Sequence, residues 1–486
     1  MPQAPRSRYP SSSAQRRQAP GRPQRRQEPR RQEPRRDASS ALDAALTAAA
    51  ALPEPPEASF ADLGVHPRLV TALAARGITG PFAIQSRAIP DALAGRDVLG
   101  RAQTGSGKTL AFGLPMLTRL AARTTPRQQK APRALILVPT RELAQQVADV
   151  LTPLGHAIDV SIAAVYGGVP ISRQIQQVRS ADVVVATPGR LADLTGRHAC
   201  TLGGIEITAL DEADHMADLG FLPAVTRILA ATPGHGQRML FSATLDNDVD
   251  RLVKRFLRNP VTHSVDAANS IVPAMTHHVF HVAGGEAKKE LVHRLASGTG
   301  RRVLFMRTKH QARKLAKQLT ESGVPSVDLH GNLSQPARDR NLAAFSTGKA
   351  RVLVATDIAA RGVHVDAVEL VVHVDPPADH KAYLHRSGRT ARAGSAGDVV
   401  TVVLPEQCKD LRSMMRRAGI DVIPQHVTAH SAPVQALVGE IAPYHASAHK
   451  AERTPNSAHP KGNRSRRSRS SVSRQRGHIE GRRSAE

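Results

Sequence analysis

The sequence predicts an α/β protein with two tandem domains built on parallel sheets, flanked by basic tails that have no hydrophobic pattern. Between residues 59 and 415, short apolar and β-branched runs alternate with segments of helical character. Near-continuous apolar strands separated by helices are typical of parallel sheets that are covered on both faces. The chain of 486 residues is too long for one typical domain, and its hydrophobic content of 41% is ample for buried cores.

Seven of the apolar runs have the length and composition of buried strands. The polar and small segment 266–274 separates the first three runs from the other four and is predicted to be an interdomain linker. The domains are therefore placed at 59–265 and 275–415, with a C-terminal extension at 416–486. The predicted strands are 134–138, 181–186, 205–210, 302–306, 351–355, 370–374 and 399–404.

Positive charge is concentrated at the two ends of the chain. Residues 1–40 contain 11 Arg and 3 acidic residues, and residues 450–486 contain 11 Lys or Arg and 3 Glu. Each end thus has a net charge of +8 within a total of +26, which favours a polyanionic partner such as nucleic acid. Residues 1–58 and the stretch from about 435 onward cannot bury enough apolar area to offset ordering entropy, so both are predicted to be disordered.

Cysteine content and hydropathy indicate a cytoplasmic protein without a membrane span. Cys200 and Cys408 are the only cysteines, which fits a reducing compartment. Met1 is followed by polar residues rather than by an apolar signal segment, and the Ala-rich run 41–52 is short and interrupted by Asp43.

A phosphate-binding loop is predicted at residues 102–109, which read Ala-Gln-Thr-Gly-Ser-Gly-Lys-Thr, with Ala102 where the usual signature has Gly. The glycines allow backbone N–H groups to approach a polyphosphate, Lys108 reaches the β- and γ-phosphates, and the Thr109 hydroxyl meets Mg²⁺. The apolar residues 97–100 before the loop and the helix-forming residues after it supply the strand–loop–helix context. This context makes a simple Gly/Ser-rich turn improbable.

Residues 211–214, Asp-Glu-Ala-Asp, follow an apolar strand and supply the carboxylates that the loop lacks. Asp211 is predicted to hold the metal, and Glu212 to orient and deprotonate a water. The two segments together indicate a nucleoside triphosphatase. Since the second domain has no phosphate loop, we expect one site at the domain interface, where ATP can clamp the domains together.

The order of these and further segments resembles that of the DEAD-box ATP-dependent RNA helicases of superfamily 2, of bacterial type. The resemblance covers roughly residues 59–415. It implies two RecA-like domains that close over ATP and single-stranded RNA, in a chain that acts as a monomer on RNA or ribonucleoprotein complexes.

On the nucleotide side, the resemblance implies that Gln85 recognises adenine, because its amide offers both a donor and an acceptor. The family usually has Thr where Phe82 stands. Arg389 and Arg392, in the segment 385–394, occupy the family's arginine-finger position and would bind γ-phosphate oxygens when the domains close. The implied nucleotide contacts are Phe60, Gln85, Ala102, Gln103, Thr104, Gly105, Ser106, Gly107, Lys108 and Thr109.

Several segments resemble the family's RNA-backbone contacts and close predicted strands. In a parallel sheet the strand C-termini share one edge, where ligands bind. The implied RNA-contacting residues are Arg141, Gly168, Thr187 and Arg190 in the first domain, and Gln335, Arg338, Thr356 and Gly362 in the second. Asp214, Ser242, Thr244 and His385 are implied to couple hydrolysis to RNA binding, with the Ser and Thr hydroxyls bonded to Asp214.

One position departs from the family at the ATP ribose. The family has Asp where this chain has His364, and Asp366 lies on the opposite face of an extended segment. We therefore predict a weaker ribose contact and a greater requirement for ATP. A His364→Asp variant should have a lower KM for ATP, and an unchanged KM would count against this.

The sequence predicts an RNA-dependent ATPase that separates short duplexes or remodels RNA–protein complexes. Two alternatives stay open. One is a DNA-directed helicase of the same superfamily, because segments that contact the backbone do not identify the sugar. The other is an RNA chaperone or scaffold that acts mainly through its tails. Every expected catalytic position is occupied, which argues against this alternative.

Overall fold

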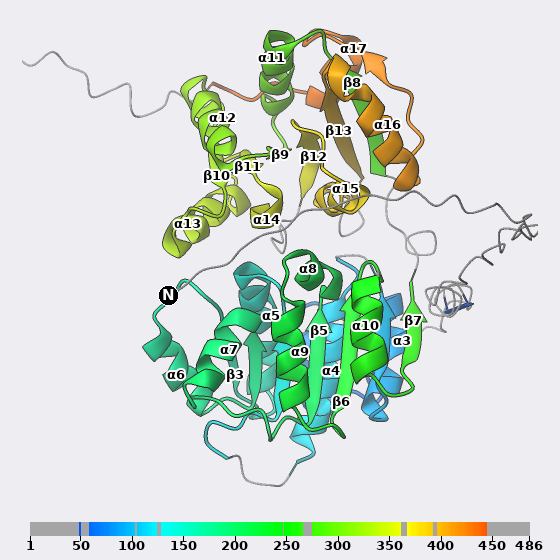
Figure 1. Cartoon of the computed structure of the whole chain (residues 1–486), viewed down its shortest axis with the longest axis vertical. Coiled ribbons are helices and arrows are strands. Elements are labelled where there is room, and N and C mark those ends of the chain that lie inside the picture. Colours follow the sequence, from blue (N-terminus) through cyan, green and yellow to red (C-terminus); the bar gives the residue numbers. More distant parts are fainter. Residues whose placement is uncertain are drawn as a thin grey trace, which may run out of the picture.

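A computed structural model describes residues 48–49, 58–102, 105–123, 128–245, 247–265, 275–360, 367–391 and 396–444. These residues form two α/β domains, one above the other in Figure 1. Each domain is built on a seven-stranded sheet, and the predicted parallel pairing of the strands is confirmed. No helix in the described ranges is long and apolar enough to cross a membrane.

The first sheet has the strand order β3-β4-β2-β5-β6-β1-β7, and all of its paired strands are parallel. Its strands are β1 Val98–Arg101, β2 Ala134–Leu137, β3 Ile162–Val165, β4 Val183–Ala186, β5 Ile207–Asp211, β6 Gln237–Ser242 and β7 Val261–Ser264. The helices are α2 Pro67–Ala74, α3 Ala83–Leu93, α4 Lys108–Ala121, α5 Arg141–His156, α6 Ile171–Arg179, α7 Pro188–Gly196, α8 Ala213–Asp218, α9 Leu222–Ala231 and α10 Asn247–Phe256.

Side chains alternate between the two faces of this sheet, and each face carries its own hydrophobic core. Val98 and Ile136 belong to one core, whereas their neighbours Leu99 and Leu137 belong to the other. The alternation follows from the two-residue period of a strand. Helices cover both faces, so the central strands are apolar throughout, which is why they could be located in the sequence.

The second sheet has the order β10-β11-β9-β12-β13-β8-β14, again with parallel pairing. Its strands are β8 Met275–His281, β9 Arg301–Phe305, β10 Ser326–Leu329, β11 Val352–Ala355, β12 Val368–His373, β13 Gly397–Val403 and β14 Gln425–His426. The helices are α11 Gly285–Ala296, α12 Lys309–Glu321, α13 Gln335–Ser346, α14 Asp357–Ala360, α15 His380–Ser387, α16 Cys408–Arg417 and α17 Ala432–Val438, with a 3₁₀ turn at Pro405–Gln407.

The chain keeps regular structure beyond residue 415. Strand β14 pairs with β8, and the buried guanidinium of Arg302 donates to the backbone oxygen of Val438 at 2.9 Å. The prediction of disorder from about residue 435 is therefore wrong for residues 435–444, since α17 packs on the second domain. A short apolar helix such as α17 is difficult to recognise in the sequence, because the polar tail that follows dominates the local composition. The remaining tail residues lie outside the described ranges.

Candidate active site

The predicted phosphate loop joins the end of β1 to the start of α4. Gly105 and Gly107 have φ values of +94° and +86°, in the left-handed region that glycine tolerates best. The Lys108 side chain is buried, and its Nζ donates to the Ala102 carbonyl oxygen at 2.8 Å. The lysine thus folds back over its own loop, next to the first turn of α4. Gln103 and Thr104 lie outside the described residues.

Gln85 lies against this loop. Its Nε2 donates to the Gly107 carbonyl oxygen at 2.9 Å, and its Oε1 accepts from the Phe82 N–H at the same distance. A Cβ at Gly107 would lie 2.3 Å from that Nε2, so only glycine fits there. Gln85 therefore ties the start of α3 to the phosphate loop. Its selection of adenine stays a prediction.

The two aromatic side chains near this segment differ in exposure. Phe60 is buried in the hydrophobic core, with 2% of its surface exposed. Phe82, at the start of α3, is 59% exposed and would contact a side chain at Gly107. In the described arrangement Phe82 borders the loop, whereas Phe60 is covered by its neighbours.

Asp211 ends strand β5 and is buried. Burial raises the pKa of its carboxyl to about 6, and the nearby Lys108 ammonium offsets only part of this effect. Its Oδ1 accepts the backbone N–H of Glu212 at 3.0 Å. Hard carboxylate and hydroxyl oxygens suit Mg²⁺, so Asp211 fits the metal that the sequence predicts.

The described residues contain no group of three or more His, Cys, Asp or Glu side chains that could hold a metal ion by themselves. Mg²⁺ beside a nucleotide is usually held by fewer protein ligands than that. One or two carboxylates contribute, and substrate phosphates and water complete the coordination.

Glu212 occupies a strained position between β5 and α8. Its φ and ψ are +51° and +54°, which is uncommon for a residue with a side chain and typical of functional sites. Burial would raise its pKa, but several contributions together lower the pKa to about 2, the largest of them being the hydrogen bond and charge of His215. The charges of Lys108 and Arg389 act in the same direction. Glu212 is therefore an ionised carboxylate at neutral pH.

Asp214 connects the two domains and the segment after β6. Its Oδ2 accepts from the Thr244 hydroxyl at 2.8 Å and from the Thr244 N–H at 2.9 Å, while its own N–H donates to the Ser242 hydroxyl at 3.2 Å. The predicted hydroxyl contacts are thus present. His385, from α15 of the second domain, places Nε2 3.8 Å from the same Oδ2.

The pKa of Asp214 reflects these partners. Burial would raise it, but the nearby His385 imidazole, together with the Thr244 hydroxyl, holds it below its usual range. Figure 1 shows α8 at the edge of the first domain that faces α14 and α15. The residues predicted to act in hydrolysis in one domain therefore lie near the arginine-bearing segment of the other.

Arg386, within α15, and Arg389, just after it, have different surroundings. Arg389 is buried, donates from Nε to the His385 carbonyl oxygen at 3.2 Å, and lies close enough to Glu212 to influence its pKa. Arg386 forms a two-point contact with the Asp357 carboxylate and donates to the Asp375 carbonyl oxygen at 2.7 Å. Sequence reasoning missed Arg386, which joins α15 to α14. Arg392 lies outside the described residues.

A second set of contacts joins the domains at the predicted RNA-binding edge. Arg338 donates from Nε to the Glu142 carboxylate at 2.7 Å, and both side chains are about nine-tenths buried. Arg141 donates to the Gln335 amide oxygen at 3.2 Å. The structure brings three predicted RNA-contacting side chains together, but it pairs them across the interface and adds Glu142, which the sequence reading did not single out.

The other predicted RNA contacts also lie at strand ends. Gly168 has a φ of +88°, and the Arg141 guanidinium fills the space where a side chain would lie. Arg190 donates to the Val169 carbonyl oxygen and to Gln174. The remaining predicted contacts are Thr187 at the end of β4, Thr356 at the end of β11, and Gly362, which lies outside the described residues.

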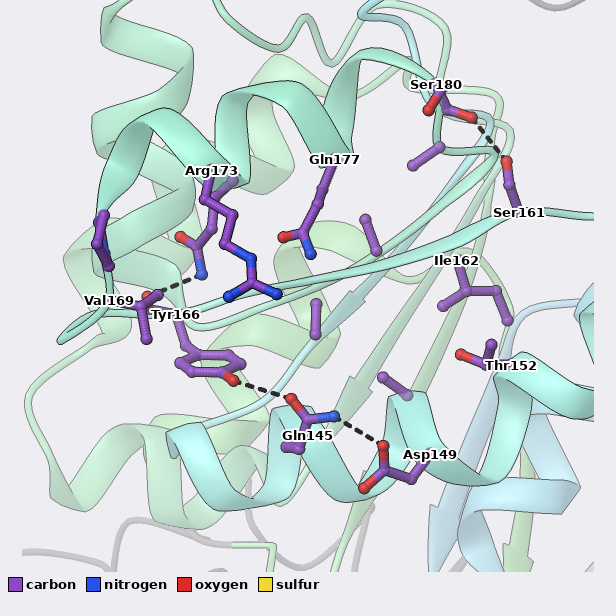
Figure 2. A pocket seen from close by; sticks show the side chains of 16 residues that line it. Gln145, Asp149, Thr152, Ser161, Ile162, Tyr166, Val169, Arg173, Gln177 and Ser180 are labelled. Carbon is purple, nitrogen blue, oxygen red and sulfur yellow. Dashed lines mark hydrogen bonds between the residues drawn. The ribbon is translucent and has the colours of Figure 1, made fainter. Parts of the chain in front are cut away.

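A cavity of about 580 Å³ lies beside this edge, between α5, α6 and the outer strand β3 (Figure 2). On its wall the Tyr166 hydroxyl donates to the Gln145 amide oxygen at 2.8 Å, and the Gln145 Nε2 donates to Asp149 at 2.7 Å. These bonds tie the end of β3 to α5. Since α5 begins at Arg141, they fix the helix that carries the interdomain contacts.

Comparison with known proteins gives a consistent result. The family model described as DEAD/DEAH box helicase matches residues 82–252, and the helicase conserved C-terminal domain matches residues 287–394. The chain is 40% identical to the RNA helicase CrhR of Synechocystis over 362 residues, covering 74% of this chain and 72% of that protein. It is 41% identical to the ATP-dependent rRNA helicase RRP3 of Mycosarcoma maydis over 347 residues, covering 71% and 61%.

Among solved structures, S. cerevisiae Dbp5 bound to RNA and ADP BeF3 is similar, with a TM-score of 0.69 and 30% identity. The similarity covers 78% of this chain and all of the Dbp5 chain. The DEAD-box ATP-dependent RNA helicase 9 of rice is 38% identical over 74% of this chain. The chain spans 58% of the length of that rice relative and 61% of the length of RRP3.

Proposed function

The chain belongs to the DEAD-box family of RNA helicases, and from that premise we propose that it is an RNA-stimulated ATPase. It would unwind short RNA duplexes or remodel RNA–protein complexes as ATP and RNA close its two domains. The observation that supports this most strongly is the approach of His385, in the second domain, to Asp214 in the first at 3.8 Å. Hydrolysis and domain closure thereby share one set of side chains.

For hydrolysis, we assign the general base to Glu212, because it is ionised and lies at a strained strand end beside the phosphate loop. Lys108, Arg389 and Arg392 would offset the charge that develops on the transferred phosphoryl group. Thr109 and Asp211 would hold Mg²⁺, which would supply further charge neutralisation and orient the phosphates. Gln85 and the loop residues 102–107 would contact the rest of the nucleotide, whereas Phe60, which is covered by its neighbours, would support this segment from the core.

For RNA, the strand-end residues Gly168, Thr187, Arg190, Thr356 and Gly362 would face the backbone. Arg141, Gln335 and Arg338 would contribute mainly by holding that edge closed, since their side chains already pair across the interface. Asp214, Ser242, Thr244 and His385 would transmit closure to the hydrolysis site.

We further propose that the protein acts as a monomer in the cytoplasm and that its two basic tails increase RNA affinity without sequence preference. Their charge of +8 each supports phosphate attraction. The chain contains no Trp, and no Phe or Tyr follows Tyr444, so the C-terminal tail lacks the large aromatic side chains on which bases stack best.

The test is steady-state ATPase turnover of the full chain with a panel of RNAs and matched DNAs. We expect stimulation by single-stranded RNA and little by DNA of the same sequence. Equal stimulation by DNA would replace the proposal with a DNA-directed helicase. Full annealing activity in a Glu212→Gln variant would instead favour a chaperone that acts through its tails.

A further inference from the structure

His215, the residue directly after Asp214, contacts the proposed general base. Its Nδ1 lies 3.1 Å from the Glu212 Oε2 atom, and the two side chains are 3% and 11% exposed. Glu212 directly precedes α8, His215 lies in the first turn of α8, and their side chains meet at the start of this helix. An ionised carboxylate only accepts hydrogen bonds, so Nδ1 must carry the hydrogen and donate.

The backbone around His215 is fixed on both sides. The His215 N–H donates to the Asp214 Oδ1 atom at 2.9 Å, and the Met216 N–H donates to the Glu212 carbonyl oxygen at 3.0 Å. Ala213 and Met216 are buried in the hydrophobic core of the first domain. His215 is therefore a rigidly held hydrogen-bond donor. The Glu212 side chain has several rotatable bonds, so its carboxylate needs such a donor to keep one orientation.

The second domain completes the surroundings of His215. The ring of His385 lies 6.4 Å from the ring of His215, centre to centre, at an angle of 42°. His385 in turn approaches Asp214, and Arg389 follows on the same segment. The two acidic side chains Glu212 and Asp214 thus each have a histidine partner, one from each domain, and the two rings are neighbours.

We propose that His215 is a positioning residue that orients the Glu212 carboxylate toward the attacking water, and that closure completes this arrangement through the ring of His385. The inference rests on the proposed function, because it assigns a partner to the base of that same site. A misplacement of about 1 Å in a reacting group can cost on the order of 100-fold in rate. Loss of the donor should therefore lower turnover without weakening nucleotide or RNA binding.

Two variants of similar size separate the donor from the packing. His215→Asn keeps an N–H donor at the place of Nδ1, whereas His215→Leu fills similar space without a donor. We expect the RNA-stimulated kcat to fall about 10- to 100-fold in His215→Leu, with the KM for ATP unchanged, and to stay near the unmodified value in His215→Asn. His215→Met is a second donor-free variant with good helix propensity, should the Leu variant fold poorly.

The matched control is His263→Leu. His263 is also buried in the first domain and has a carboxylate partner, Asp91, at 2.9 Å, but it lies on β7. That substitution should lower the melting temperature and leave kcat unchanged. Equal kcat in the Leu and Asn variants of His215, whether high or low, would overturn the positioning role.

The proposed contribution of the His385 ring on domain closure is tested by a separate measurement. The ratio of unmodified to His215→Leu turnover should be larger with saturating RNA than without it, because only closure brings the His385 ring into contact. An equal ratio would refute the part assigned to His385. If the unmodified protein showed no stimulation by RNA, the proposed function would fail, whereas a stimulated protein that is indifferent to His215→Leu overturns this inference alone.

Discussion

The two edges of the domain interface are built differently. At the RNA-side edge, Arg338 and Glu142 form a direct ion pair at 2.7 Å, and Arg141 donates to Gln335 at 3.2 Å. At the nucleotide-side edge, the cross-domain approach of His385 to Asp214 is 3.8 Å. The contacts of Arg338 and Arg141 at the first edge are thus shorter than the contact of His385 with Asp214 at the second.

The difference indicates which ligand completes which edge. At the nucleotide side, Lys108 and Arg389 face the carboxylates of residues 211–214, and a bound triphosphate would add the negative charge that joins them. At the RNA side the protein supplies both charges of the pair. Closure at the nucleotide side should therefore depend on ATP, and loss of a charged group there should affect turnover more than binding.

The largest expected effect comes from Arg389→Ala. Arginine fingers contribute roughly 10³–10⁵ in rate in other phosphoryl-transfer enzymes, so RNA-stimulated kcat should fall by a similar factor. The measurement is single-turnover ATP hydrolysis at saturating RNA. Arg313→Ala, an exposed arginine on α12, is the control and should keep full turnover. A clearly active Arg389→Ala enzyme would refute the assignment.

Glu212→Gln should have the next largest effect. The amide cannot take a proton, and general-base catalysis is typically worth about 10²–10⁴ in rate. ATP-dependent RNA binding, measured by fluorescence anisotropy, should persist, because the amide keeps the shape of the side chain. Glu286→Gln, at a highly exposed carboxylate of α11, serves as control. Retention of normal turnover would mean that another group accepts the proton.

Arg338→Ala should weaken the RNA-side edge with a smaller effect on chemistry. Breaking a buried ion pair by removing one partner costs about 3–5 kcal/mol, because the other charge is left buried. We expect a higher RNA concentration for half-maximal ATPase stimulation, partly restored by a second substitution, Glu142→Ala. The exposed pair Arg68–Asp159 supplies the control, Arg68→Ala. An unchanged RNA requirement would show that this pair does not contribute to closure.

Deletion of residues 445–486 should have the smallest effect on turnover. It removes a net charge of +8, so RNA affinity should fall and its dependence on salt should become less steep. The saturated kcat should not change, since every residue assigned to hydrolysis comes before residue 445. RNA titrations of the full and shortened chains at several salt concentrations measure this. Identical affinities and slopes would show that the tail does not bind RNA.

The fold was predictable where strands are buried on both faces. All seven runs chosen from the sequence are strands, within two residues at each end. The strands that the sequence did not reveal include β3 and β7 at the edges of the first sheet and β10 and β14 at the edges of the second. Edge strands such as Ser326–Leu329 are only half buried and contain polar residues, so they lack the continuous apolar run of a central strand.

The site was predictable where a short motif has a fixed chemical role, and not where partners meet only in space. The loop at 102–109 and the acidic residues 211–214 could be found from their residue patterns and from the apolar strands that precede them. Glu142 and Arg338 are 196 residues apart, and nothing in their spacing indicates that they pair. His215 likewise gains its contact with Glu212 from the first turn of α8, a local geometry that a motif does not specify.

The distance between the two domains, measured together with turnover, tests the central claim most directly: hydrolysis depends on closure driven jointly by ATP and RNA. Spin labels at Arg227→Cys and Lys317→Cys, in a Cys408→Ser background, report this distance by pulsed electron resonance. We expect a short distance only when a non-hydrolysable ATP analogue and RNA are both present, with ATPase turnover rising in step with the closed fraction. Full closure with one ligand alone, or rapid hydrolysis in the open arrangement, would contradict the account.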